Sequence, residues 1–88
     1  MTLKIESVSD VSGTVIKLIG RMQAEHLQEL ETQIQRGGSA ITLDLGQLSL
    51  VDVEAVRFLG ECQIQGMHII HCSTYIRDWI DKEAHPEE

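Results

Sequence analysis

Basic residues are scarce in this chain of 88 residues, which has 7 Lys and Arg against 14 Asp and Glu and a net charge of −7. Nucleic-acid-binding proteins concentrate Lys and Arg on one face to contact phosphates, whereas the basic residues here are widely scattered. Long hydrophobic runs are also absent, because charged and polar residues interrupt every apolar stretch well before the roughly 18 residues that span a bilayer. The composition therefore argues against a nucleic-acid partner and against insertion into a membrane.

Cysteine is sparse as well, since the only two are Cys62 and Cys72, and their spacing does not suggest a disulfide framework. The first residues, MTLKIE, lack the uninterrupted apolar region of a secretory signal, so we expect a protein of the reducing cytoplasm. The length suits one domain over residues 1–88. A chain this short buries only about 60–65% of its unfolded surface, which leaves little packing for a deep substrate cavity and excludes large enzymes.

The spacing of apolar residues predicts four strands and three helices. The chain is expected to begin with a strand from Leu3 to a turn at Asp10–Gly13, followed by a return strand over Thr14–Ile19 and a helix over Met22–Arg36. Next come a strand over Ala40–Leu45, a loop through Gly46, a helix from Asp52 to Gly66 and a strand over His68–Cys72. The last element is a short helix capped by Ser73 or Thr74, with Tyr75, Ile76, Trp79 and Ile80 on its apolar side. Residues 83–88 are polar, contain the only Pro, and are expected to form a frayed tail.

This order predicts a two-layer α/β fold with a four-stranded mixed sheet and helices packed on one face. Two strand–helix–strand units in series place parallel strands side by side through right-handed crossovers, and the opening hairpin adds an antiparallel strand at one edge. The opposite face of the sheet is expected to be comparatively open, with an apolar patch at Val15, Ile19 and Ile70.

Metal-ligating residue types are present but do not converge. His68 and His71 are three residues apart, which on a strand points their rings to opposite faces. Both Cys are better explained as small buried hydrophobic residues than as ligands or nucleophiles. We therefore expect no metal site.

Other catalytic patterns are equally weak. The chain has no glycine-flanked Ser elbow, and Gly37 and Gly38 follow a helix, where free carbonyls rather than amides are found. Asp44, Asp52 and Glu54 could lie at one end of the sheet, but no spacing places them in a shared pocket. The residues thus indicate neither a catalytic site nor a bound cofactor.

Asp52 and Glu54 have a structural explanation of their own. Asp52 suits the N-cap of the second helix, and Glu54 complements the positive end of the helix dipole, each contributing on the order of 0.5 to 1 kcal/mol. In an α/β layer the places where strands end and helices begin are also where ligands and partners are usually met. The start of the second helix is therefore the candidate site.

Three segments together resemble the STAS family, the sulfate-transporter and anti-sigma-factor-antagonist domains. Gly13–Met22 (GTVIKLIGRM) is similar to the family's opening strand and Gly-Arg-Leu turn, and Ile41–Leu45 (ITLDL) is similar to its central Leu-Asp-Leu strand. Val51–Val56 (VDVEAV), with Leu59 after it, matches the spacing of the Asp-Ser-Ser-Gly-Leu segment. The resemblance covers residues 3 to about 82 and implies the STAS fold.

The resemblance implies a non-enzymatic binding module of bacterial-type signal transduction. In such a module a kinase-like anti-sigma partner phosphorylates a Ser or Thr at the start of the second helix, which breaks the complex. Here that position is Glu54, its neighbours are Val53 and Ala55, and only Asp52 is retained. Because Glu54 has no hydroxyl, the usual switch cannot operate at this position.

Two interpretations of Glu54 stay open. One is that it mimics the phosphorylated state, although a single charge reproduces only part of the roughly −1.5 to −2 that a phosphate carries. The other is that Glu54 is simply a residue suited to a helix start, since the helix dipole alone is enough to explain a Glu at this position.

We expect the partner to bind through Asp52 and Glu54, flanked by Arg57 one turn further on and by Arg21 in the turn before the first helix. The partner implied is an anti-sigma factor or a kinase-like regulator. The alternative is a cytoplasmic STAS accessory subunit of a lipid-transport ABC system, whose partner is a transport ATPase. The sequence does not separate these two functions, and it leaves a weak homodimer open.

Overall fold

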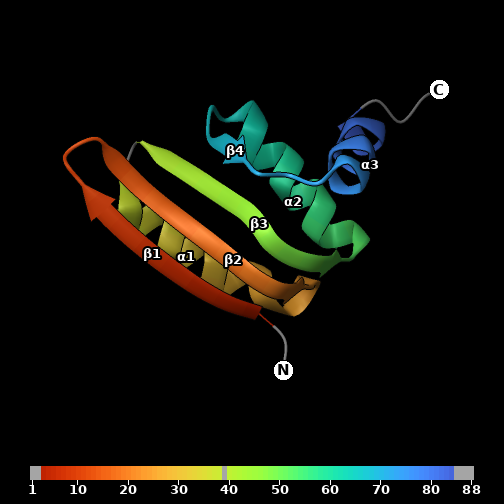
Figure 1. Ribbon diagram of the computed structural model, residues 1–88, viewed down its shortest axis with the longest axis horizontal. Helices are drawn as coiled ribbons and strands as arrows, with labels where there is room; N and C mark the ends of the chain where they lie inside the picture. The colour runs from red at the N-terminus through yellow and green to blue at the C-terminus, as the bar shows by residue number, and fades with distance from the viewer. Residues whose placement is uncertain (1–2, 39, 85–88) are drawn as a thin grey trace.

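The computed structural model describes residues 3–38 and 40–84 of the chain. They form a four-stranded sheet in the order β1-β2-β3-β4 together with three α-helices (Figure 1). The elements are β1 (Leu3–Asp10), β2 (Gly13–Met22), the short 3-10 turn η1 (Ala24–His26), α1 (Leu27–Gly37), β3 (Ile41–Val51), α2 (Val53–Ile64), β4 (His68–Ile70) and α3 (Thr74–Ala84).

The sheet is mixed, as the element order predicts. β1 and β2 form an antiparallel hairpin, whereas β2–β3 and β3–β4 are parallel pairs. Asp10 makes the hairpin turn, because its Oδ1 accepts hydrogen bonds from the Ser12 backbone N–H at 2.8 Å and from the Ser12 hydroxyl at 2.7 Å. In each parallel pair the two strands are connected by a helix, which returns the chain to the start of the next strand.

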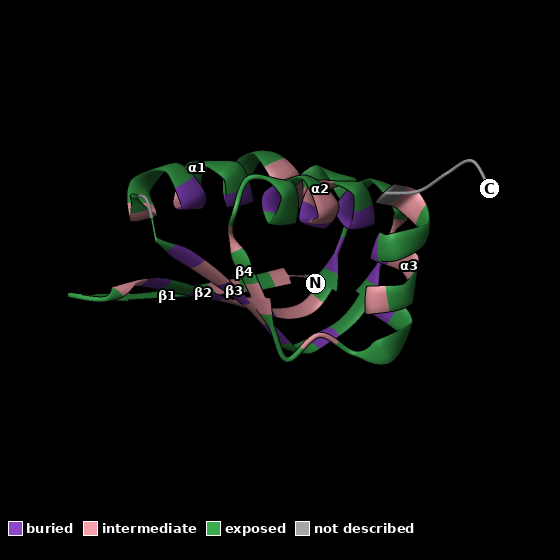
Figure 2. Ribbon diagram, turned by 90° about the horizontal axis from the view of Figure 1, so that it is seen from above, coloured by how far each residue is buried: buried purple, intermediate pink, exposed green. Residues whose placement is uncertain are grey.

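The core lies between the sheet and its helices. Figure 2 shows α1 and α2 on the same side of the sheet, and α3 packs beside α2. The buried residues follow the predicted periodicities: alternate positions of β2 and β3, and one stripe of each helix, namely Ile16, Leu18, Leu43, Leu45, Leu30, Ile34, Ala55, Val56, Leu59, Cys62, Ile76 and Ile80. The two-layer α/β prediction is confirmed.

β3 is longer than predicted. The residue pattern predicts a strand that ends at Leu45 and a loop through Gly46, but the strand continues to Val51. The register between β2 and β3 shifts between Lys17 and Ile19, opposite the stretch around Gly46, and pairing then resumes. Because a bulge absorbs the glycine, it does not end the strand.

β2 also extends beyond its predicted end at Ile19. β3 offers it partners as far as Val51, which pairs with Met22. Two expectations are therefore wrong: Arg21 lies in a strand rather than in a turn, and the first α-helix does not begin at Met22. Met22 is fully buried at the end of β2, and α1 begins at Leu27 after η1.

The C-terminal elements differ from the prediction in three ways. β4 ends at Ile70 instead of Cys72, because His71 adopts a positive φ of 57° and the chain leaves the sheet. The spacing predicts Tyr75 on the apolar side of the last helix, yet it is 48% exposed. Glu83 belongs to α3 rather than to a frayed tail, while residues 85–88 of that predicted tail lie outside the described residues.

The face of the sheet opposite the helices is open, with side chains of both polarities. Val15 and Ile70 are exposed on it, as predicted, and Ile19 is half-buried. Lys17 and Asp44 pair in register between them and interrupt the expected apolar patch, while Val15 lies opposite the exposed Val8 of β1. No helix among the described residues has the length and apolar character needed to cross a membrane.

Candidate functional site

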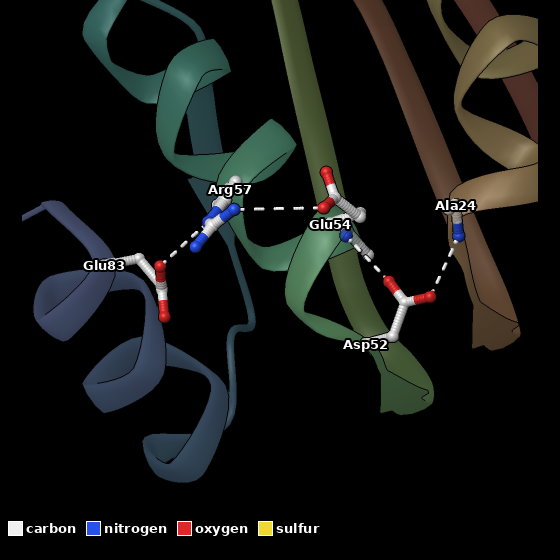
Figure 3. A network of polar contacts seen from close by, with 6 residues as sticks. Ala24, Asp52, Glu54, Arg57 and Glu83 are labelled. Carbon is white, nitrogen blue, oxygen red and sulfur yellow. Dashed lines mark hydrogen bonds and ion pairs between the residues drawn. The ribbon is translucent and has the colours of Figure 1, made fainter.

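Asp52 joins three segments at the end of the sheet. It is the N-cap of α2, as predicted, since its Oδ1 accepts a hydrogen bond from the Ala55 backbone N–H at 2.9 Å. Its Oδ2 accepts a second hydrogen bond, from the Ala24 backbone N–H at 3.0 Å (Figure 3). The Asp52 N–H donates to the Met22 carbonyl at 3.3 Å. One residue thus ties the end of β2 and the start of η1 to the start of α2.

Glu54 and Arg57 lie one helical turn apart on α2, as the sequence predicts. Glu54 occupies the second position of the helix, and its Oε2 lies 3.8 Å from Nη1 of Arg57. Both side chains are largely exposed. A loose, exposed pair of this kind leaves the Glu54 carboxylate accessible to another molecule.

Arg57 has a closer partner that the sequence analysis missed. Its Nε donates to Oε1 of Glu83 on α3 at 3.0 Å, and Figure 3 shows the guanidinium between Glu83 and Glu54. The hydrogen bond and charge of Glu83, followed by the charge of Glu54, raise the pKa of Arg57 above its usual value. The polar composition of residues 83–88 predicts a frayed tail there, and no local pattern links Glu83 to a residue 26 positions earlier.

Arg21 approaches the site from β2. It is exposed and pairs in register with Leu50 of β3. Within the part of the chain that the structure describes, Arg21 makes no ion pair with Glu54 or with Asp52. It therefore flanks the site without joining the contacts that hold it together.

Two exposed apolar residues complete this surface, and neither is among the predicted site residues. Leu50 is 48% exposed near the end of β3, and Val53 is 37% exposed at the first position of α2. Their position on either side of the cap residue is a signal that the sequence does contain. We call the surface formed by Arg21, Leu50, Asp52, Val53, Glu54 and Arg57 the α2-start surface.

Asp44 does not belong to this site. It lies near the start of β3, whereas Asp52 follows the end of the same strand, so the expectation that the three carboxylates could share one end of the sheet is wrong. Asp44 Oδ1 instead lies 3.0 Å from Nδ1 of His71 and accepts the Gly46 N–H at 2.9 Å. Among the described residues no group of three metal-ligating side chains occurs.

The Asp44 carboxyl is expected to titrate below its ordinary value of 3.8, because the Gly46 N–H, the His71 ring and the Lys17 charge all lower its pKa. A lowered folded-state pKa means that the stabilisation is present above the ordinary value and is lost as pH falls through the lowered one. Carbon-13 NMR titration of the Asp44 carboxyl carbon measures this pKa directly.

In the His71→Ala variant the Asp44 midpoint should rise without returning fully to 3.8, since the Gly46 donor remains. Asp10, whose pKa is lowered by Ser12 instead, is the internal control and should keep its midpoint. If the Asp44 midpoint is the same in the wild type and in His71→Ala, the contact between Asp44 and His71 is not formed in solution.

The cysteines have the environments of inert thiols. Cys62 is 3% exposed, and burial raises its pKa to about 11. Cys72 is half-buried, less than predicted, and burial raises the pKa of its thiol as well. Both therefore stay protonated at neutral pH, which disfavours nucleophilic chemistry.

This chain is similar to known proteins in its structure. No protein-family model matches the sequence, and no curated protein matches it. Among solved structures, the crystal structure of an antisigma-factor antagonist, a STAS domain from Rhodobacter sphaeroides, superimposes with a TM-score of 0.62 over 80% of this chain and 87% of that one. The two sequences are 10% identical. The match shows that the fold of this chain is STAS-like, as the three sequence motifs predict.

Proposed function

We propose that this STAS-like fold serves as a non-enzymatic interaction module, which binds a signalling protein through the α2-start surface. The observation that carries the proposal is that two apolar residues, Leu50 and Val53, are exposed on either side of Asp52 in the chain, Leu50 paired in register with Arg21 and Val53 in the same helical turn as Glu54. An apolar centre with a charged rim is the usual anatomy of a protein interface. The similar solved structure is described as an antisigma-factor antagonist, which supports a partner of the anti-sigma or kinase-like type.

The proposed module lacks the usual phosphorylation switch. Residues 50–57 contain no Ser, Thr or Tyr, and the position equivalent to the family's phosphoacceptor is Glu54. A carboxylate in this position gives the surface a charge that no kinase adds and no phosphatase removes. We propose that this charge contacts a basic group of the partner, in addition to complementing the helix dipole.

The partner can be identified by capture from native lysate with the wild-type chain as bait, followed by mass spectrometry. Recovery of an anti-sigma or kinase-like protein supports the proposal, whereas recovery of a transport ATPase favours the alternative, an accessory subunit of a lipid-transport ABC system. A Glu54→Gln bait run in parallel shows whether capture depends on the α2-start surface. If both baits recover the same proteins equally, that surface is not the interface.

Once the partner is known, Glu54→Gln is expected to weaken its binding by about 2 kcal/mol, roughly thirtyfold in Kd, because a desolvated charge pair is lost. The melting temperature should fall by less than about 8 °C, since the lost dipole contribution is at most about 1 kcal/mol. Calorimetry on the folded proteins measures the affinity. Glu31→Gln on α1 is the matched control and should bind like wild type, because Glu31 is exposed on another helix.

A Glu54→Ser variant tests the lost switch. It restores a hydroxyl at the position equivalent to the family's phosphoacceptor, and phosphate mapped to position 54 after incubation with the partner and ATP would identify the partner as a kinase. Equal affinity of wild type, Glu54→Gln and Glu54→Ser would instead remove Glu54 from the interface and leave it as a helix-start residue.

A further inference from the structure

β1 is an edge strand that nothing in its own geometry protects. All eight of its residues pair with β2 in one unbroken register, and no strand among residues 3–38 and 40–84 pairs with its other side (Figure 1). Natural proteins usually shorten or bulge such edges, or place Pro or charged residues such as Lys on them, to prevent pairing with another chain. The opposite edge follows this rule, since β4 has only three residues, whereas β1 has neither a bulge nor a Pro.

The side chains of β1 present different chemistry on the two faces of the sheet. Leu3 and Ile5 are half-buried against the core on the helix side. Lys4, Glu6 and Val8 alternate with them on the open side, where Val8 is 67% exposed. A strand added at this edge would therefore have to continue an apolar row on one face and match charges of both signs on the other.

We infer that the strand that fits this edge is β1 of a second copy, paired antiparallel with Ile5 opposite Ile5 across a twofold axis. Residues directly opposite in an antiparallel pair share a face, so this register puts Lys4 opposite Glu6 of the second copy, twice over. Leu3 then lies opposite Ser7 of the second copy, and Ile5 extends the apolar row across the axis. The result is a continuous eight-stranded sheet.

The charges of β1 select this register over its neighbours. Moving the axis to Lys4 places the two Lys4 side chains opposite each other, and moving it to Glu6 does the same for the two carboxylates. Of these three registers, only the one centred on Ile5 turns both like-charge contacts into ion pairs. Within one chain Lys4 Nζ already lies 3.2 Å from Glu6 Oε2, so both side chains extend over the same face.

The association is weak because the interface is small. Strand pairing over residues 3–7 covers less than the roughly 1,200 Å² of a standard stable interface. The two copies also carry a net charge of −7 each, which opposes their approach at low salt. A salt concentration of about 0.15 M screens this repulsion beyond about 8 Å and leaves the directly opposed Lys4–Glu6 contacts effective.

Sedimentation analysis of the chain alone, from about 10 µM to 1 mM, tests the inference without the proposed partner. We expect the average mass to rise with concentration from 9.9 kDa towards twice that value. Lys4→Glu should weaken dimerisation at least about tenfold, because it places two like-charge pairs in the interface. The exchange Lys4→Glu with Glu6→Lys restores the pairing and should restore the dimer.

Lys82→Glu, at an exposed position of α3, changes the net charge equally and should leave dimerisation nearly unaltered. Circular dichroism confirms that each variant is folded. The inference is overturned if the wild type stays monomeric at 1 mM, if Lys4→Glu and Lys82→Glu behave alike, or if the charge exchange fails to recover the dimer.

Amide hydrogen exchange provides a second measurement that locates the interface. At high concentration the outward-facing amides between Leu3 and Ser7 should become protected by at least about tenfold, and the other amides should keep their rates. Concentration-dependent protection on α2 or α3 instead of β1 would assign self-association to a different surface and reject the β1 pairing.

Discussion

Asp52→Ala is expected to lower the free energy of unfolding by about 2–3 kcal/mol, because one carboxylate accepts hydrogen bonds from two separate backbone N–H groups. An ordinary N-cap substitution costs about 1 kcal/mol, so the excess measures the contact with Ala24. In a domain of this size the melting temperature should fall by roughly 10–20 °C. Urea denaturation followed by circular dichroism measures the free energy.

Asp52→Asn separates the two hydrogen bonds. Its amide oxygen can still cap α2, whereas its amide nitrogen cannot accept a hydrogen bond from Ala24, so the expected cost is about 1 kcal/mol. Asp78→Ala at an exposed position of α3 is the control and should change stability by less than about 0.5 kcal/mol. A result in which the Ala and Asn variants are equally stable would mean that Oδ1 and Oδ2 do not act independently.

Gly13→Ala should destabilise the fold by about 3 kcal/mol or more, through two effects at the start of β2. Gly13 has a φ of +140°, which L-residues rarely adopt. A Cβ at this position would lie 2.6 Å from the carbonyl oxygen of Ala40, and that oxygen accepts the Thr14 N–H at 2.8 Å. Because the obstacle is backbone, the β2–β3 pairing itself must shift to relieve the contact.

Gly66→Ala is the matched control for backbone conformation. Gly66 also has a positive φ, of +97°, but no described atom lies within 4 Å of the position a Cβ would take. It should therefore cost only about 1–2 kcal/mol. If thermal and urea denaturation give the same loss for both variants, the contact with Ala40 contributes nothing and the effect of Gly13 is conformational alone.

The fold was predictable from the sequence because its decisive patterns are local. One face of β3 carries Ile41, Leu43 and Leu45 at alternate positions, and one face of α1 carries Leu30 and Ile34 one turn apart. The buried side of each element can therefore be predicted from a few neighbouring residues. What could not be predicted depends on partners distant in the chain. β3 continues beyond Leu45 because β2 offers it backbone partners, and a glycine that reads as a loop signal becomes a bulge inside a ladder.

The candidate site divides in the same way. Asp52 as a cap and Glu54 at the helix start follow from residue type and position alone. The contact between Asp52 and Ala24 joins residues 28 positions apart, and that between Arg57 and Glu83 joins residues 26 apart. Neither has a local signature, and the polar composition around Glu83 suggested a tail rather than a helix that packs on α2.

The double role of Asp52 also bears on the thermodynamics of recognition. A surface whose backbone is already tied at η1 and at α2 loses little conformational entropy when a partner docks, so most of the contact energy appears as affinity. Association should then proceed as near-rigid docking, with a rate set by electrostatic steering and little by loop ordering. Freeing the Ala24 end would turn the same side chains into a surface that must be ordered at each encounter.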